Sequence, residues 1–204
     1  MLKILIAHHY PILRKGLQAV IGEIFQKTDV DHAECGRETL EKCRNNRYDL
    51  VILGLSLPGI NGMDLLRKIN PDGKDGHTLV LGDHDEELLG LRAIKTGARG
   101  YLRKTCCETE MKEAIRRVAA GERYYSRCMM DRLAECASES AGAGSLESLS
   151  DREHQIFMEL KAGKTVKEIA GELCLDPKTI YSHRERMRRK LGMKSDREFL
   201  ALVA

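Results

Sequence analysis

The sequence predicts an α/β doubly wound five-stranded parallel sheet followed by a small all-α domain of four helices. Two observations lead to this fold class. Over residues 1–122, short apolar runs alternate with helical patterns, as expected for a parallel sheet that is covered on both faces. Over residues 149–204, three capping-box patterns and one Asp-Pro start signal occur within about 55 residues, which indicates four closely spaced helices.

The first domain should contain five strand–helix units. The apolar runs that predict strands are Ile4–Ala7, Val30–Ala33, Leu50–Leu53, Leu79–Leu81 and Gly100–Leu102. The helical patterns that follow them are Pro11–Glu23, Glu38–Asn45, Gly62–Ile69, Glu86–Ala93 and Glu108–Ala120. Five such units fit the strand order 2-1-3-4-5, which puts a functional crevice at the carboxyl ends of the strands.

A linker should separate the two domains. Arg127–Ala137 continues with a helical pattern, and Ser138–Ser148 is small and polar, which is typical of a flexible connection. We therefore expect a first domain at 1–122, a linker helix and flexible linker at 123–148, and a second domain at 149–204.

Composition limits the possible functions. The chain has 204 residues, a net charge of +3 and seven Cys without a secretory signal, so we expect a soluble protein of the reducing cytoplasm. No apolar run approaches the roughly 20 residues of a membrane span, so no membrane partner is expected. No nucleophile–base constellation is visible, and we expect neither an enzyme nor a cofactor.

Asp176–Leu191 has the pattern of an amphipathic, strongly basic helix. Asp176 can cap it, and Pro177 suits its first position. Ile180 and Met187 should face the core, whereas the opposite face is polar. From residue 178 to residue 194 there are seven Lys or Arg and one acid, a charge of +6. A shorter helix, Thr165–Leu173, precedes it across a tight turn, which makes a helix-turn-helix.

Such a helix is a candidate DNA reader, although a charged run more often forms only a solvated surface. The candidates for phosphate contact are Lys178, Thr179, His183, Arg186, Arg189 and Lys190, and of these we expect His183 to be partly buried. The candidates for base contact are Tyr181, Ser182 and Glu185. One short helix reads few base pairs, so we expect a homodimer on double-stranded DNA with an inverted-repeat operator.

The second domain resembles the LuxR-type DNA-binding domain of NarL/FixJ response regulators. The residues that carry this resemblance are LSDRE (149–153), GKTVKEIAGEL (163–173), KTIYSH (178–183) and RKLG (189–192). The first domain resembles the receiver domain of the same family, through LPGINGMDLL (57–66), TGARGYLRK (96–104) and AAGERYYS (119–126). The resemblance implies a bacterial transcription regulator.

The phosphorylation site that the resemblance implies is degenerate. The family has two acids after the first strand, where this chain has His8 and His9. The phosphate-accepting Asp is replaced by Gly54, and the phosphate-binding Ser/Thr by Gly82. Only Tyr101 and Lys104 match. We therefore expect regulation without Asp phosphorylation, because Gly54 offers no nucleophile and neutral imidazoles are poor magnesium ligands. Asp49, Asp64, Asp83 and Asp85 are nearby in sequence, but none occupies the acceptor position.

Two alternatives stay open. His8, His9 and His84 could bind a metal, or the emptied pocket could bind a small effector. We instead expect solvent-facing loop histidines that fill the vacated space, because adjacent residues of a continuing strand point in different directions. The second alternative is an antagonist whose receiver pairs with another response regulator.

Overall fold

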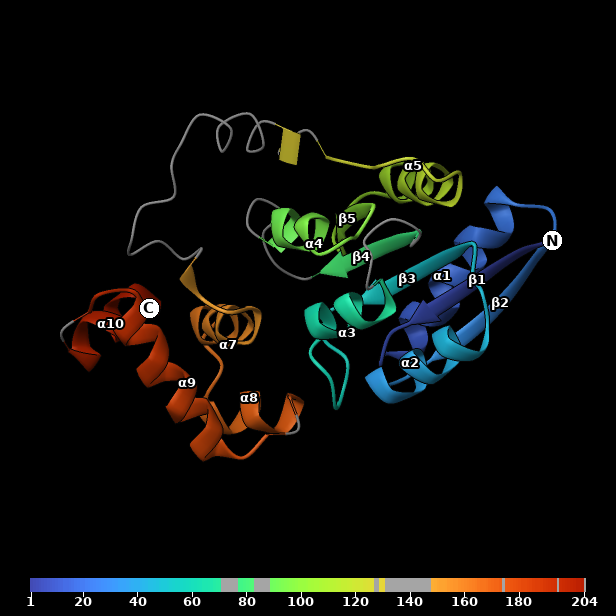
Figure 1. Cartoon of the computed structure of the whole chain (residues 1–204). Helices are drawn as coiled ribbons and strands as arrows, with labels where there is room; N and C mark the ends of the chain where they lie inside the picture. Colours follow the sequence, from blue (N-terminus) through green and yellow to red (C-terminus); the bar gives the residue numbers. More distant parts are fainter. Residues whose placement is uncertain are drawn as a thin grey trace. The chain divides into compact units, whose positions relative to one another are not determined.

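The computed structural model describes residues 1–70, 77–82, 89–126, 129–130, 148–173, 175–193 and 195–203. The chain forms two compact units, Met1–Ala137 and Ser138–Ala204 (Figure 1). Most of the expected linker helix and flexible linker lies outside the described residues, as do His84, Asp83, Asp85 and the first part of the expected helix 86–93.

The first unit contains a five-stranded parallel sheet in the order β2-β1-β3-β4-β5, which confirms the predicted topology. The strands are β1 (Leu2–Ala7), β2 (Thr28–Ala33), β3 (Leu50–Gly54), β4 (Thr78–Gly82) and β5 (Gly100–Arg103). The β3 and β4 strands are buried along their whole length, because both neighbouring strands and helices on both faces cover them.

Helices cover both faces of this sheet (Figure 1). They are α1 (Pro11–Ile24), α2 (Gly36–Asn45), α3 (Gly62–Ile69), α4 (Leu91–Lys95) and α5 (Glu108–Ala119). One core includes Leu17 of α1 and Ile115 of α5, and the other includes Leu65 of α3 and Ala93 of α4. Each apolar strand contributes alternate residues to the two cores, as the pleat requires.

Two elements differ from the sequence-based expectation. The strand β2 (TDVDHA) is largely polar and half-buried rather than apolar, and it lies at one edge of the sheet, where polar residues are tolerated. The α4 helix ends at Lys95 rather than at Ala93, followed by Gly97 with φ +109°. The amide of Ala98 there donates to the carbonyl of Ala93.

The second unit is a helical bundle of α7 (Asp151–Lys161), α8 (Val166–Glu172), α9 (Pro177–Lys190) and α10 (Asp196–Val203). Capping boxes open α7 at Ser150 and α8 at Thr165, as the sequence predicts. The core gathers Ile156 and Phe157 of α7, Ile169 of α8, Met187 of α9 and Phe199 of α10. Among the described residues, every helix falls short of the length and apolarity needed to cross a bilayer.

Candidate functional site

The α9 helix has well-defined ends. The carboxylate of Asp176 accepts from the Lys178 amide at 2.7 Å, and Pro177 occupies the first turn. At the other end, Gly192 has φ +71°; its amide donates to the Arg189 carbonyl, and the Met193 amide donates to the Arg188 carbonyl. These two bonds form a Schellman motif, for which a left-handed glycine is favoured. Both termini of the helix are therefore fixed by local sequence.

The two faces of α9 are as predicted. Ile180 and Met187 are completely buried in the helical core. On the opposite side, the exposed residues include five candidates for contact with DNA: Lys178, Ser182, Glu185, Arg186 and Arg189. The Tyr181 side chain is also exposed, at 56%, which is unusual for a large aromatic residue. The guanidinium of Arg184 lies 5.9 Å from the Tyr181 ring and 5.8 Å from the Phe199 ring, so it links α9 to α10.

A shallow hollow of about 190 Å³ lies on the second half of α9, lined by Arg186, Arg189 and Lys190. Lys190 donates at 2.7 Å to Glu153, whose side chain is only 4% exposed. Burial alone would raise the pKa of Glu153, but hydrogen bonds from Lys190 and Ser150 outweigh it and lower the pKa. Glu153 thus stays ionised and holds the Lys190 ammonium at one side of the hollow.

His183 is half-buried, as anticipated. Burial and the nearby charge of Arg186 lower its pKa, so the ring is neutral at neutral pH. A contact from His183 to phosphate would therefore be a neutral hydrogen bond. Glu185 forms an ion pair with Arg188 in which two guanidinium nitrogens donate to the two carboxylate oxygens. The sequence alone did not indicate this role for Arg188.

At the carboxyl ends of the strands, two glycines lie against two large side chains. A Cβ atom on Gly54 would lie 2.4 Å from Cδ2 of His8, and one on Gly82 would lie 1.9 Å from the hydroxyl oxygen of Tyr101. His8 is 1% exposed and Tyr101 is completely buried. The volume that side chains at positions 54 and 82 would need is therefore occupied by His8 and Tyr101.

His8 fills the space beside Gly54, as expected, but it is buried rather than solvent-facing, so that part of the expectation is wrong. The β1 strand ends at Ala7, so the alternation of strand side chains does not extend to the two histidines. The rings of His8 and His9 instead stack at a centroid distance of 5.0 Å and an interplanar angle of 16°. The Tyr10 ring continues the group, with its centroid 3.6 Å from that of His9, and the Lys104 ammonium lies 5.9 Å from the Tyr10 centroid.

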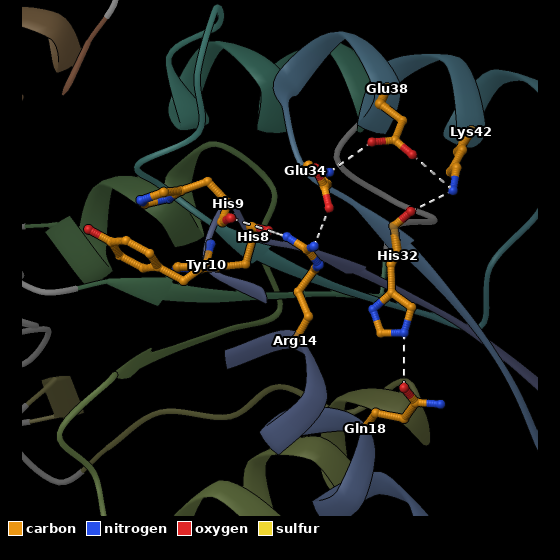
Figure 2. Close-up of polar contacts among 9 residues, drawn as sticks. All are labelled: His8, His9, Tyr10, Arg14, Gln18, His32, Glu34, Glu38 and Lys42. Carbon is orange, nitrogen blue, oxygen red and sulfur yellow. Dashed lines mark hydrogen bonds and ion pairs between the residues drawn. The ribbon is translucent and has the colours of Figure 1, made fainter. Parts of the chain in front are cut away.

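Arg14 fixes the backbone of this turn. Figure 2 shows its guanidinium between the carbonyls of His8 and His9 and the carboxylate of Glu34. The bond to the His8 carbonyl is 2.6 Å long, and the Arg14 side chain is only 8% exposed. The sequence carried a signal for this residue, because Arg14 precedes Leu17 and Ile21 at helical spacing on the buried face of α1.

The other candidate acids lie elsewhere. The Asp49 carboxylate accepts from the Lys3 amide at 2.7 Å, just before β3 begins. Asp64 lies in the first turn of α3 and pairs with Arg67. Among the described residues, no group of three or more His, Cys, Asp or Glu side chains is arranged to hold a metal ion.

Two family models match the chain: the response regulator receiver domain over residues 4–116, and the luxR family of bacterial regulatory proteins over residues 147–203. Response regulator UvrY of Escherichia coli K12 is 34% identical over 204 residues, with 100% of this chain and 94% of UvrY covered. GacA of Pseudomonas aeruginosa is 34% identical over 205 residues, with 100% and 95% covered. The structure of RcsB from Salmonella enterica serovar Typhimurium bound to promoter rprA has a TM-score of 0.64 at 21% identity, covering 100% of this chain and 98% of RcsB.

The parallel α/β unit, the helix-turn-helix unit and these matches define a class, that of DNA-binding transcription regulators of two-component systems. The chain belongs to the response-regulator family, with a receiver domain followed by a luxR-family domain. The family resemblance read from the sequence is thereby confirmed. The degenerate phosphorylation site and the individual DNA contacts stay predictions.

Proposed function

We propose that this chain binds double-stranded DNA sequence-specifically, as a homodimer that places α9 in the major groove. The observation that carries the proposal is the exposed basic face of α9, a helix whose two ends are fixed by local sequence. Charge of this density on one helix face is suited to the phosphate backbone.

The proposed contacts divide into two groups. Those to phosphate come from cationic side chains and from hydroxyl or imidazole hydrogen-bond donors: Lys178, Thr179, His183, Arg186, Arg189 and Lys190. Those to base edges come from Tyr181, Ser182 and Glu185. Arg186, Arg189 and Lys190 line one hollow of α9, and we assign these three cations to the contact with one backbone phosphate.

The dimer and the domain boundaries belong to the same proposal. Two copies related by two-fold symmetry recognise an inverted repeat, so operator selection should return such a sequence. We place the domains at 1–122 and 149–204, with the linker at 123–148. The division between Ala137 and Ser138 falls within this linker, which supports the assignment.

The salt dependence of binding tests the assignment to phosphate. For the full chain, log affinity should fall steeply with log salt, and Lys178→Gln or Arg189→Gln should each reduce the slope by about 0.9. Lys15→Gln is the matched control, because Lys15 is equally charged and exposed but lies on α1. An affinity insensitive to salt, or equal slopes for all three variants, would remove α9 from the interface.

We further propose that the regulator acts without Asp phosphorylation. Gly54 has no oxygen nucleophile, and the space around it is filled by His8. The hydroxyl that would bind a phosphoryl group is missing at Gly82, where Tyr101 takes the space instead. An effector shifts a conformational equilibrium only through contacts that differ between the two states, and here a phosphoryl group lacks both the acceptor at position 54 and the hydroxyl at position 82.

Acetyl phosphate with magnesium tests this second proposal. Mass spectrometry of the treated protein should show no base-labile phosphoryl adduct, and DNA affinity and oligomeric state should stay unchanged. An adduct at Asp83, Asp85 or another acid, together with tighter operator binding, would contradict it. The same packing counts against the alternative of a small effector bound at this site, because His8 and Tyr101 already occupy the spaces beside the two glycines.

A second candidate function, pairing with another response regulator, is favoured by one observation. Tyr10 and Ile12 are 54% and 79% exposed where α1 begins, next to the carboxyl end of β1. Exposed apolar side chains at this position suit a protein partner. Ile12→Lys should then abolish co-purification with the other regulator and leave the affinity of the purified chain for DNA unchanged; equal recovery with both chains would exclude it.

A further inference from the structure

Arg188 of α9 directs each of its three guanidinium nitrogens to an acceptor inside the protein. Its Nε donates to Oε2 of Glu185 at 3.0 Å, and its Nη2 donates to Oε1 at 2.7 Å. Its Nη1 donates to the Met193 carbonyl at 3.0 Å. The side chain is 23% exposed, compared with 49% for Glu185. Arg188 is therefore turned toward the protein and toward Glu185 rather than toward solvent.

The hydrogen bond from Arg188 to the Met193 carbonyl restrains the Arg188–Glu185 ion pair. Met193 belongs to the Schellman turn, in which its amide also donates to the backbone carbonyl of Arg188. Arg188 is thus attached to the Schellman turn through both its backbone carbonyl and its guanidinium. An exposed ion pair between residues three apart on a helix normally adds little stability, because holding two long side chains in one geometry costs conformational entropy. Here one partner has lost that freedom already, so the Glu185 carboxylate is held in one orientation.

The held carboxylate keeps capacity for DNA. A carboxylate offers about four lone-pair sites, and the two bonds from Arg188 use one on each oxygen. The hydrogen bonds from Arg188 keep the pKa of Glu185 below its ordinary value, so the group stays an acceptor. A carboxylate on an exposed recognition helix can accept from the N4 amino group of cytosine, and it repels the phosphate backbone that its neighbours attract.

We propose that Arg188 is a positioning residue for sequence readout: it contacts no phosphate, and it aligns Glu185 so that this carboxylate accepts the amino group of one cytosine. The proposal rests on the function proposed above, in which α9 enters the major groove. It assigns opposite roles to two adjacent arginines, because the neighbouring Arg189 is exposed and lines the cationic hollow.

The experiment uses the full chain and an operator obtained by selection from random duplexes. Affinities are then measured for this operator and for single substitutions at every base pair. Arg188→Gln and Arg188→Lys should each reduce discrimination at one C·G pair by about 5-fold to 100-fold, the range of one well-placed base contact. Their affinity for the duplex substituted at that pair should change little. Glu185→Ala should remove the same discrimination, and adding Arg188→Lys to it should remove none further.

Arg189→Gln is the matched control. It removes the same charge one residue away, and it should weaken binding to every duplex by a similar factor and reduce the salt slope. The variant Arg188→Lys keeps the charge and lacks the two-point geometry, so it gives a result even if Arg188→Gln lowers the melting temperature. Full discrimination retained by Arg188→Lys, or a uniform loss by Arg188→Gln like that of Arg189→Gln, would overturn the proposal. A wild-type chain that selects no operator would instead overturn the proposed function beneath it.

Discussion

Replacing Gly82 by alanine should destabilise the receiver unit through a single contact. Gly82 is not among the glycines with positive φ, so an added Cβ meets no backbone penalty. It would, however, lie 1.9 Å from the hydroxyl oxygen, 2.6 Å from Cζ and 3.0 Å from Cε2 of Tyr101. The hydroxyl oxygen and two ring carbons of Tyr101 are too close for a small adjustment, and the ring is completely buried in a closely packed interior.

The size of the effect follows from what must move. Overpacking a buried site by one methyl group costs about 1–3 kcal/mol, and we expect the upper part of this range because the ring is rigid. Replacing Tyr101 by leucine should cost about 2–4 kcal/mol alone, from lost burial. In that background Gly82→Ala should cost almost nothing, which gives a coupling of about 1–3 kcal/mol between the two positions.

Hydrogen exchange of the β4 and β5 amides in the full chain measures the stability of this unit separately from the other. The control is Gly16→Ala on α1, where an added Cβ meets nothing within 4 Å. That change should stabilise by about 0.5–1 kcal/mol, because alanine favours the helix. Equal protection in Gly82→Ala and Gly16→Ala, or an unchanged cost of Gly82→Ala after Tyr101→Leu, would refute the reasoning.

Three further changes test the second unit. The pKa of Glu153 is lowered in the folded chain, so the stability that its ionised form contributes is present above the ordinary value of 4.5 and is lost as pH falls through the folded pKa. In Glu153→Gln the melting temperature should therefore fall less steeply with pH below about pH 5, and an unchanged pH dependence would contradict this. Lys164 donates to Glu159 at 2.8 Å, and the Glu159 side chain is only 7% exposed. Lys164→Gln should therefore lower the free energy of unfolding of this unit by about 1–3 kcal/mol, measured by thermal unfolding, and a change near zero would show that solvent reaches Glu159. Leu202 on α10 is 42% exposed, and Leu202→Glu should weaken operator binding by disturbing the dimer, with little change in melting temperature; parallel loss of both would show that Leu202 only seals the bundle.

Local signals explain why most elements were predictable from the sequence. The caps of α7, α8 and α9 involve residues two or three positions apart, so the sequence located these helix starts. Strand–helix alternation likewise predicted the sheet order. The sequence suggested that histidines fill the vacated space, but the burial of His8 and the contacts at Gly54 and Gly82 could not be predicted in the same way. His8 meets Gly54, and Tyr101 meets Gly82, only because neighbouring strands bring their ends together, and periodicity within one strand carries no information about that register.

The contacts beside Gly54 and Gly82 also limit how this pocket can change through mutation. An aspartate at position 54 needs the volume that His8 fills, and a hydroxyl residue at position 82 needs the volume that Tyr101 fills. A single substitution at either glycine therefore produces an overpacked protein of lower stability. His8 must shrink or turn away before an acidic residue is tolerated, and the order of substitutions becomes as important as their identity. Paired substitutions that change His8 with Gly54, or Tyr101 with Gly82, should therefore be tolerated better than either glycine substitution alone.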